Sequence, residues 1–203
     1  MPGHDIVYKA KTRWLNWKLV YFLMTTFLAL LLAHLLADFP LQTNRIFRLK
    51  IKGNAGLVLH VVIHIIMAAL LLQQPGQYLD LLLVLGLAHF ITDWIKIRFP
   101  GNPQWPGFIL DQLAHLLAIA LLSWWWPEVT AVLPLWIMLP LILLVLLPAG
   151  LMLLWVWAND VQQQTRFQES ASIHWASSRL LTISQRTGWV AVFLVIICRL
   201  IIL

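Results

Sequence analysis

Charged residues are scarce in this chain: they make up 11% of its 203 residues, and only eight of them are acidic. An average soluble domain has about 25% charged residues. Hydrophobic residues make up 61% instead, and the mean hydropathy is +0.83. This balance excludes an ordinary soluble domain and predicts an integral membrane protein.

Cysteine is almost absent as well. The sole cysteine, Cys198, lies in the last apolar segment, which excludes an internal disulfide and a cysteine-based metal cluster. A cleavable signal peptide is not expected, because the polar and basic start of the chain precedes an apolar run long enough to cross a bilayer. We therefore expect the N-terminus to be retained.

Apolar runs recur at about the 20-residue length that crosses 30 Å of hydrocarbon. They predict an all-α, polytopic transmembrane bundle of about six spans, forming a single membrane domain. The expected spans are 19–39, 55–73, 79–98, 106–126, 131–157 and 187–203. The fifth run contains Pro134, Pro140, Pro148 and Gly150, which favours a broken helix.

A polar segment, 159–187, separates the last two spans. Its mixture of glutamines with residues such as Trp175 suits a helix lying at the membrane interface, or equally a surface loop. We expect this segment to belong to a peripheral part of the bundle, 127–203.

The formal charge of +6 comes from basic residues that flank the apolar runs. Such flanks are typical of topology control and of contact with anionic lipid headgroups, so we expect membrane lipid, and no nucleic acid, as a partner. A homo-oligomer is left open. The loops after spans one, three and five hold Arg45, Arg48, Lys50, Lys52, Lys96, Arg98, Arg166, Arg179 and Arg186. The positive-inside rule makes these loops cytoplasmic, although four basic residues before the first span argue the opposite way.

The chain resembles itself at an offset of 55 residues. The stretch 32–39 (LAHLLADF) aligns with 87–94 (LAHFITDW), and the same register continues to the histidines at positions 60 and 115. We interpret the match as an internal duplication of a two-helix unit, which gives a four-helix core over 19–126 with a pseudo-twofold axis along the bilayer normal.

Four predicted spans each carry two polar residues four positions apart, which places them one turn apart on one helix face. These pairs lie at span ends that all belong to one side of the membrane, so we expect them to converge. The pairs are His34/Asp38, His60/His64, His89/Asp93 and Asp111/His115.

Buried His and Asp are costly in hydrocarbon and normally pair, face a cavity or bind an ion. A mixed imidazole and carboxylate set predicts one or two divalent ions of zinc, manganese or iron. Residues that obey the repeat are the expected metal ligands: His34, Asp38, His60, His89, Asp93 and His115. His64 and Asp111, whose repeat counterparts are Ile119 and Gly56, become the candidates for a second ion or for proton transfer in catalysis.

Three further polar residues lie near these pairs. Gln42 and Gln112 are candidates for second-shell hydrogen bonds or for a polar headgroup, and Lys96 for attracting an anionic substrate. Each of these residues also has an interpretation without a function: a histidine or glutamine could be a hydrogen-bonded packing residue, and Lys96 could extend to the membrane surface. Asp38 could pair with Arg45 or Arg48, and Asp93 with Lys96 or Arg98.

The segment HLLADFPLQ at 34–42, followed by His60, by the H-x3-D motif at His89 and by the D-Q-x2-H motif at Asp111, resembles a family of small bacterial membrane proteins known only as a domain of unknown function. The resemblance covers roughly residues 25–125. It implies a multi-pass protein of the bacterial inner membrane and brings no established activity. The paired His and Asp residues are also similar, in architecture only, to membrane-bound metal-dependent hydrolases that include phospholipid-acting enzymes.

The sequence thus favours a metal-dependent membrane hydrolase that acts on a lipid or another membrane-associated substrate, with a metal-bound water attacking a phosphate or acyl ester. An ion or proton-coupled transporter is the main alternative. A haem b held by His60 and His115, a di-iron lipid oxidase and a non-enzymatic assembly factor also stay open.

Overall fold

A computed structural model describes residues 21, 23–164 and 170–202 of the chain. These residues form an all-α bundle, as the sequence predicts. After an N-terminal helix, Leu23–Asp38, come α2 (Asn44–Lys52), α3 (Asn54–Leu71), α4 (Leu79–Arg98), α5 (Gln104–Trp125), α6 (Leu135–Gln162) and α7 (Ala171–Ile202), with a short 3₁₀ turn, η1 (Pro75–Tyr78), between α3 and α4. Five of the described helices, α3 to α7, are long and apolar enough to cross a membrane, α4 together with η1.

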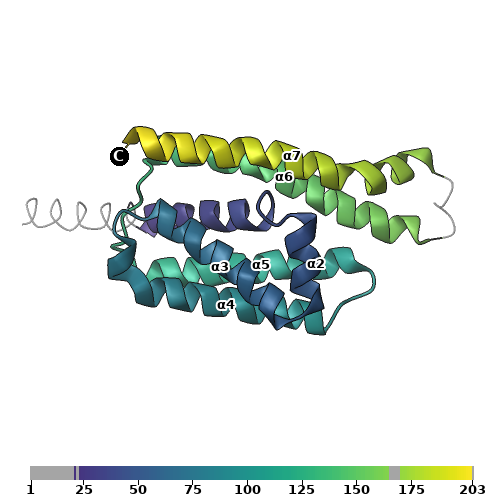
Figure 1. Cartoon of the computed structure of the whole chain (residues 1–203), viewed down its shortest axis with the longest axis horizontal. Coiled ribbons are helices and arrows are strands. Elements are labelled where there is room, and N and C mark those ends of the chain that lie inside the picture. Colours follow the sequence, from purple (N-terminus) through teal and green to yellow (C-terminus); the bar gives the residue numbers. More distant parts are fainter. Residues whose placement is uncertain (1–20, 22, 165–169, 203) are drawn as a thin grey trace, which may run out of the picture.

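The N-terminal helix lies in the middle of the bundle, between the α6–α7 pair and the helices α3 to α5 (Figure 1). Leu32, Leu36 and Ala37 on this helix are fully buried, and the hydrophobic core includes residues from every helix except α2. A helix that is apolar all round is expected to be enclosed in this way. The start of the predicted span 19–39 falls partly outside the described residues.

The last two helices differ from the prediction in two respects. The fifth apolar run forms one continuous helix, α6, despite Pro140 and Pro148 inside it. The polar segment is not a separate interfacial helix or loop over most of its length, because its residues from Ala171 onward continue without a break into the last span as α7. At 1.5 Å per residue, a helix of 32 residues is about 48 Å long, more than the hydrocarbon thickness.

Buried polar contacts tie these long helices together. The Ser184 hydroxyl on α7 donates a hydrogen bond to the backbone carbonyl of Pro148 on α6, at 2.8 Å. The buried Asp160 carboxylate, near the end of α6, accepts a 2.7 Å hydrogen bond from the backbone N–H of Trp105. That N–H lies in the first turn of α5, where it has no partner within its own helix. Asp160 therefore caps α5 from outside.

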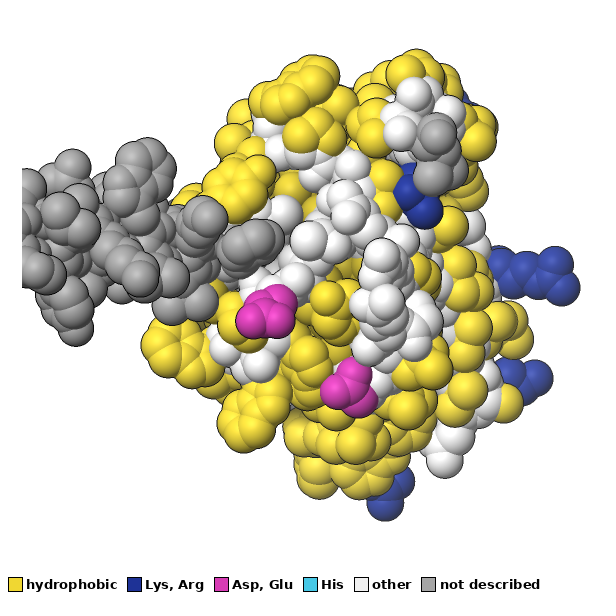
Figure 2. Space-filling model, turned by 90° about the vertical axis from the view of Figure 1, so that its left-hand side faces the viewer, with side chains coloured by type: hydrophobic (Ala, Val, Ile, Leu, Met, Phe, Trp, Pro, Cys, Tyr) yellow, Lys and Arg dark blue, Asp and Glu magenta, His cyan; other side chains and the backbone are white. Residues whose placement is uncertain are grey.

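The two ends of the bundle differ in charge. The end that carries α2, the end of α4 and the start of α7 holds the basic residues of the connecting segments (Figure 1), as expected; Arg166 lies outside the described residues. The opposite end presents mainly hydrophobic and uncharged surface with acidic side chains, and the last turn of α7 adds Arg199 there (Figure 2). There the turn after α3 is joined to the α5–α6 loop through hydrogen bonds from Gln73 to Thr130 and from Val132 to Leu71.

Candidate metal centre

The eight His and Asp residues of the four predicted pairs are all buried and converge near the basic end of the bundle. Each pair comes from a different helix: the N-terminal helix, α3, α4 and α5. The i, i+4 spacing places both members of a pair on the inward face of its helix, as predicted. Imidazole and carboxylate groups from four helices therefore share one interior site.

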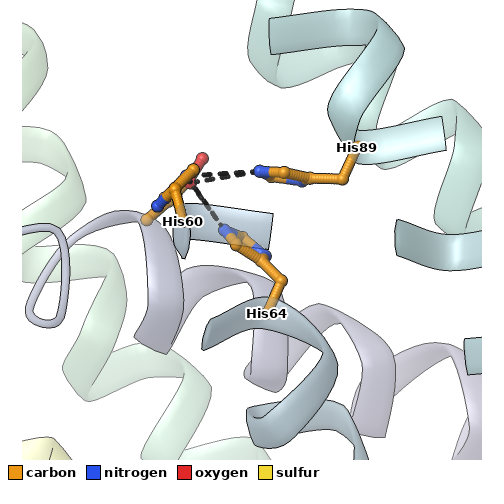
Figure 3. A group of neighbouring side chains, drawn as sticks. His60, His64 and His89 are labelled. Carbon is orange, nitrogen blue, oxygen red and sulfur yellow. Dashed lines mark hydrogen bonds and ion pairs between the residues drawn. The ribbon is translucent and has the colours of Figure 1, made fainter. Parts of the chain in front are cut away.

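The tightest group has one carboxylate and three imidazoles. The Oδ1 atom of Asp38 lies 3.1 Å from Nε2 of His60 and 3.0 Å from Nε2 of His64. The Nε2 atom of His60 is in turn 3.2 Å from that of His64 and 3.3 Å from that of His89. In Figure 3 the rings of these three histidines, two on α3 and one on α4, point toward one another. We call Asp38, His60, His64 and His89 the N3O group.

The spacing within the N3O group matches the donor spacing of a tetrahedral metal site. With metal–nitrogen bonds of 2.0–2.1 Å, neighbouring ligand atoms of a tetrahedron lie about 3.3–3.4 Å apart. Four separations in the group are 3.0–3.3 Å, and a fifth, from His89 to Asp38 Oδ1, is 3.8 Å. Nitrogen lone pairs this close repel one another unless a proton or a cation lies between them. The four residues can hold a metal ion.

Two more groups adjoin the first and could also hold an ion. One consists of His34, His89 and His115, and the other of Asp93, Asp111 and His115. His89 belongs to two groups and stacks on the His115 ring at 4.1 Å between centroids. The six residues paired by the 55-residue offset all lie in this continuous cluster, while the duplication itself stays a prediction.

Several atoms of the cluster lack a hydrogen-bond partner among the described residues: His60 Nδ1, both carboxylate oxygens of Asp93, Asp111 Oδ1 and His115 Nε2. The Asp93 oxygens do make charge contacts, with Lys50 at 2.6 Å and with His89 at 3.2 Å, but outside hydrogen-bond geometry. Buried polar atoms are normally satisfied. Four of these five atoms belong to Asp93, Asp111 and His115, so that group has polar atoms available to a ligand.

Lys50 is a member of the site that the sequence did not reveal. The sequence assigned it, with its basic neighbours on α2, to the membrane surface. Instead its side chain is buried, with Nζ 2.6 Å from Asp93 Oδ1 and 3.2 Å from Gln42 Oε1, to which it donates. Lys50 lies four residues after Ile46 on α2, and these two are less exposed than the residues between them, so they form the inward face of this helix.

The predicted pairings of the aspartates with surface arginines are not found. Asp38 contacts histidines and accepts a hydrogen bond from the Gln112 amide at 3.1 Å. Gln112 also bonds to Asp111 and lies 3.3 Å from His34, so it links three residues of the cluster. Lys96 pairs with Asp111, not Asp93, at 2.6 Å, and lies over the Phe108 ring.

Gly56, the predicted repeat counterpart of Asp111, lies at a close contact between two helices. A Cβ atom at Gly56 would lie 2.0 Å from the backbone oxygen of Leu49 on α2. Only glycine permits this approach of α2 to α3. Position 56 therefore cannot hold a carboxylate that would correspond to Asp111 in the predicted repeat.

Two cavities adjoin the cluster. A cavity of about 10 Å³, the space of a single water, is lined by His34, His64, His89 and His115 together with apolar residues. A larger one, of about 780 Å³, opens toward the basic end and is lined by Asp38, Asp111 and all three predicted substrate-binding residues, Gln42, Lys96 and Gln112.

Residues 26–143 match the model of a family described as Protein of unknown function (DUF3307). This chain belongs to that family. The matched region runs from the N-terminal helix into α6 and contains every residue of the cluster. No curated protein and no solved structure gives a match to the chain. The family match thus gives the extent of the domain but no activity.

Proposed function

We propose that this protein is a membrane-embedded metalloprotein, with one divalent ion of the zinc, manganese or iron class in the N3O group. The observation that carries the proposal is the meeting of three histidine Nε2 atoms and one aspartate oxygen at separations of 3.0–3.3 Å. Three nitrogens and one oxygen suit zinc best. His64, a candidate for catalysis from the sequence, becomes a proposed ligand.

We further propose that the ion serves a hydrolase. With four protein ligands, a divalent ion in this site would take a water as a fifth ligand, and it would then supply a nucleophile at neutral pH and polarise the ester that is attacked. Asp111 is then the proposed general base, because it lines the larger cavity and lies 3.5 Å from His115 without belonging to the N3O group. Its contact with Lys96 orients the carboxylate. The reaction takes place at one end of the bundle, in what we propose is the bacterial inner membrane.

Transport is the second candidate function, and the apolar lining of the small cavity beside the histidines argues against it. Apart from the histidines, the small cavity is lined by Leu30, Ala33, Leu85, Ala88, Ala118 and Ile119. A continuous ion path needs polar groups through both leaflets. A haem is disfavoured as well, since His60 Nε2 lies in contact with two other imidazoles and leaves no room for a porphyrin.

Metal analysis of the purified protein tests the proposal. After reconstitution with zinc, manganese or iron, about one ion per chain is expected, and the His60→Ala variant should lose it. His174→Ala is the matched control, because His174 is exposed on α7, away from the cluster. The proposal is wrong if the wild-type protein holds no stoichiometric metal, or if the His60→Ala variant has the same metal content as the wild type.

The hydrolase part has its own test. Asp111→Asn should keep the ion and lose turnover of phosphate-ester or acyl-ester lipids in mixed micelles. Transport would replace hydrolysis as the function if the metal-loaded wild-type protein cleaved neither class of lipid but carried the ion across proteoliposome membranes. The Asp93→Asn variant should then lose this flux.

A further inference from the structure

The larger cavity has a two-sided lining that the metal centre alone does not explain. On the cluster side its wall contains the polar and charged groups Asp38, Lys50, Lys96 and Gln112 among apolar residues such as Phe108. On the side of α6 and α7 the wall is mainly apolar, with Met152, Trp155, Val156 and Leu181. Its volume of about 780 Å³ lies within the range of ligand-binding pockets, about 300–1,000 Å³.

Several lining residues also face the outside of the bundle. Ile51 on α2, Ile95 on α4 and Leu110 on α5 line the cavity, and between 49% and 67% of each is exposed. In a spanning bundle, exposed apolar side chains of this kind face lipid. The rim of the cavity therefore meets the lipid-facing surface, so an occupant can enter sideways from the bilayer with its apolar part still in contact with apolar groups.

The charges at the polar wall select the headgroup. Asp38 and Asp111 line this wall, and Asp93 contacts Lys50 of the same wall. With Lys50 and Lys96 as counterions and the histidines neutral, the three aspartates leave one net negative charge. A divalent ion in the N3O group changes this to one net positive charge. The loaded site then favours an anion next to the ion.

Lys96 is the group best placed to receive that anion. Its side chain is 36% exposed, against 4% for its partner Asp111, and it lines the cavity. An ammonium has three N–H donors, and the Asp111 contact at 2.6 Å engages one of them. The other donors can serve a phosphate oxygen.

We propose that this cavity binds a membrane amphiphile with an anionic phosphate headgroup. The phosphate lies near Lys96 and the metal ion, and an acyl chain lies against the α6–α7 wall. The inference rests on the proposed function, because the positive charge of the polar wall requires the ion. It names the substrate class of the same site: a phosphate-ester lipid taken from the bilayer.

Equilibrium binding of fluorescent lysophosphatidic acid to the zinc-loaded protein in detergent tests the inference. Leu181→Trp, which fills the apolar side of the cavity, should weaken binding about tenfold, and Lys96→Gln should do the same at the polar side. Leu200→Trp is the matched control, because Leu200 is 69% exposed on the same helix. Monoacylglycerol, which lacks the phosphate, should bind about tenfold more weakly than lysophosphatidic acid.

The outcomes separate the two proposals, with metal content measured on every sample. Metal-loaded protein that does not bind lysophosphatidic acid, or binds it equally in all variants, overturns the lipid inference and leaves the metal site intact. Competition by glycerol 3-phosphate at the same concentration would assign the site to soluble phosphate esters and overturn the lipid source. Protein without metal overturns the proposed function, and the inference falls with it. If Leu181→Trp does not fold, the Lys96→Gln and monoacylglycerol comparisons still decide.

Discussion

The buried cluster has two halves, the N3O group with Asp38 and the group of Asp93, Asp111 and His115. Both consist of histidines and aspartates, but their carboxylates are neutralised differently. Asp38 faces three imidazoles of the N3O group and has no lysine among its contacts with described residues. Asp93 and Asp111 each contact a lysine at 2.6 Å, from α2 and α4 respectively. A tethered ammonium already supplies the positive charge in the second half, whereas the first half leaves its charge and lone pairs for a free ion. One ion is therefore expected, although the sequence allows two.

Removing the buried lysine should have the largest effect. Lys50→Met leaves Asp93 uncompensated in the interior, which typically costs about 3–5 kcal/mol. The double variant Lys50→Met/Asp93→Asn should be less destabilised than Lys50→Met alone, because no charge is then left unpaired. Denaturant unfolding in detergent measures both. If Lys50→Met unfolds like the wild type, the lysine is not the counterion of Asp93.

Replacing Asp38 and Asp93 one at a time by asparagine compares the two halves by their affinity for zinc. Asp38→Asn removes a proposed ligand, so its affinity for zinc should fall at least about 100-fold, beyond the 10–100-fold typical of second-shell changes. Asp93→Asn should have a smaller effect on the same titration. Equal losses in the two variants would mean that the ion lies between the halves, not in the N3O group.

A smaller change is expected at Gln112, which bonds to Asp38 and Asp111 and lies close to His34. Gln112→Leu keeps every proposed ligand but removes the support of the Asp38 carboxylate. Zinc affinity should fall about tenfold, as for other groups that orient ligands. Gln42→Leu serves as the control, since Gln42 contacts Lys50 and not the N3O group. A larger loss for Gln42→Leu than for Gln112→Leu would contradict this assignment.

The smallest effect on stability should come from Lys96. Its ion pair with Asp111 is partly exposed, and such pairs contribute about 1 kcal/mol or less. Lys96→Gln also keeps a hydrogen-bond donor beside Asp111. The unfolding midpoint should therefore shift far less than in Lys50→Met. A shift as large as that of Lys50→Met would show that the two lysines play the same structural part.

Much of this site could be predicted because a strong physical rule applied to it. His and Asp at i, i+4 in four apolar runs have to face inward, and the alternating direction of the spans brings those ends together. The structure has this arrangement for all eight residues. The helix periodicity did not extend to α2, because a nine-residue helix among loops gives no apolar period from which the inward face of Lys50 could be read.

Tertiary contacts explain the other differences. The polar residues 171–187 were separated from the last span on hydropathy, but Ser184 and Leu180 are buried and the helix continues through them. Pro140 and Pro148 suggested a break that neighbouring helices make unnecessary. The assignment of His64 to catalysis followed from its lack of a repeat counterpart, whereas distance places it beside Asp38.

The central position of the N-terminal helix has a consequence for biogenesis. Leu23–Asp38 precedes in the chain every helix that encloses it, and Pro40 just after it lies against Gly188 of α7. During synthesis His34 and Asp38 thus enter the membrane long before their surroundings exist. The centre needs groups from four helices, the last of which is α5, so its residues can meet only once the chain has been made through His115, and metal binding is expected after that point.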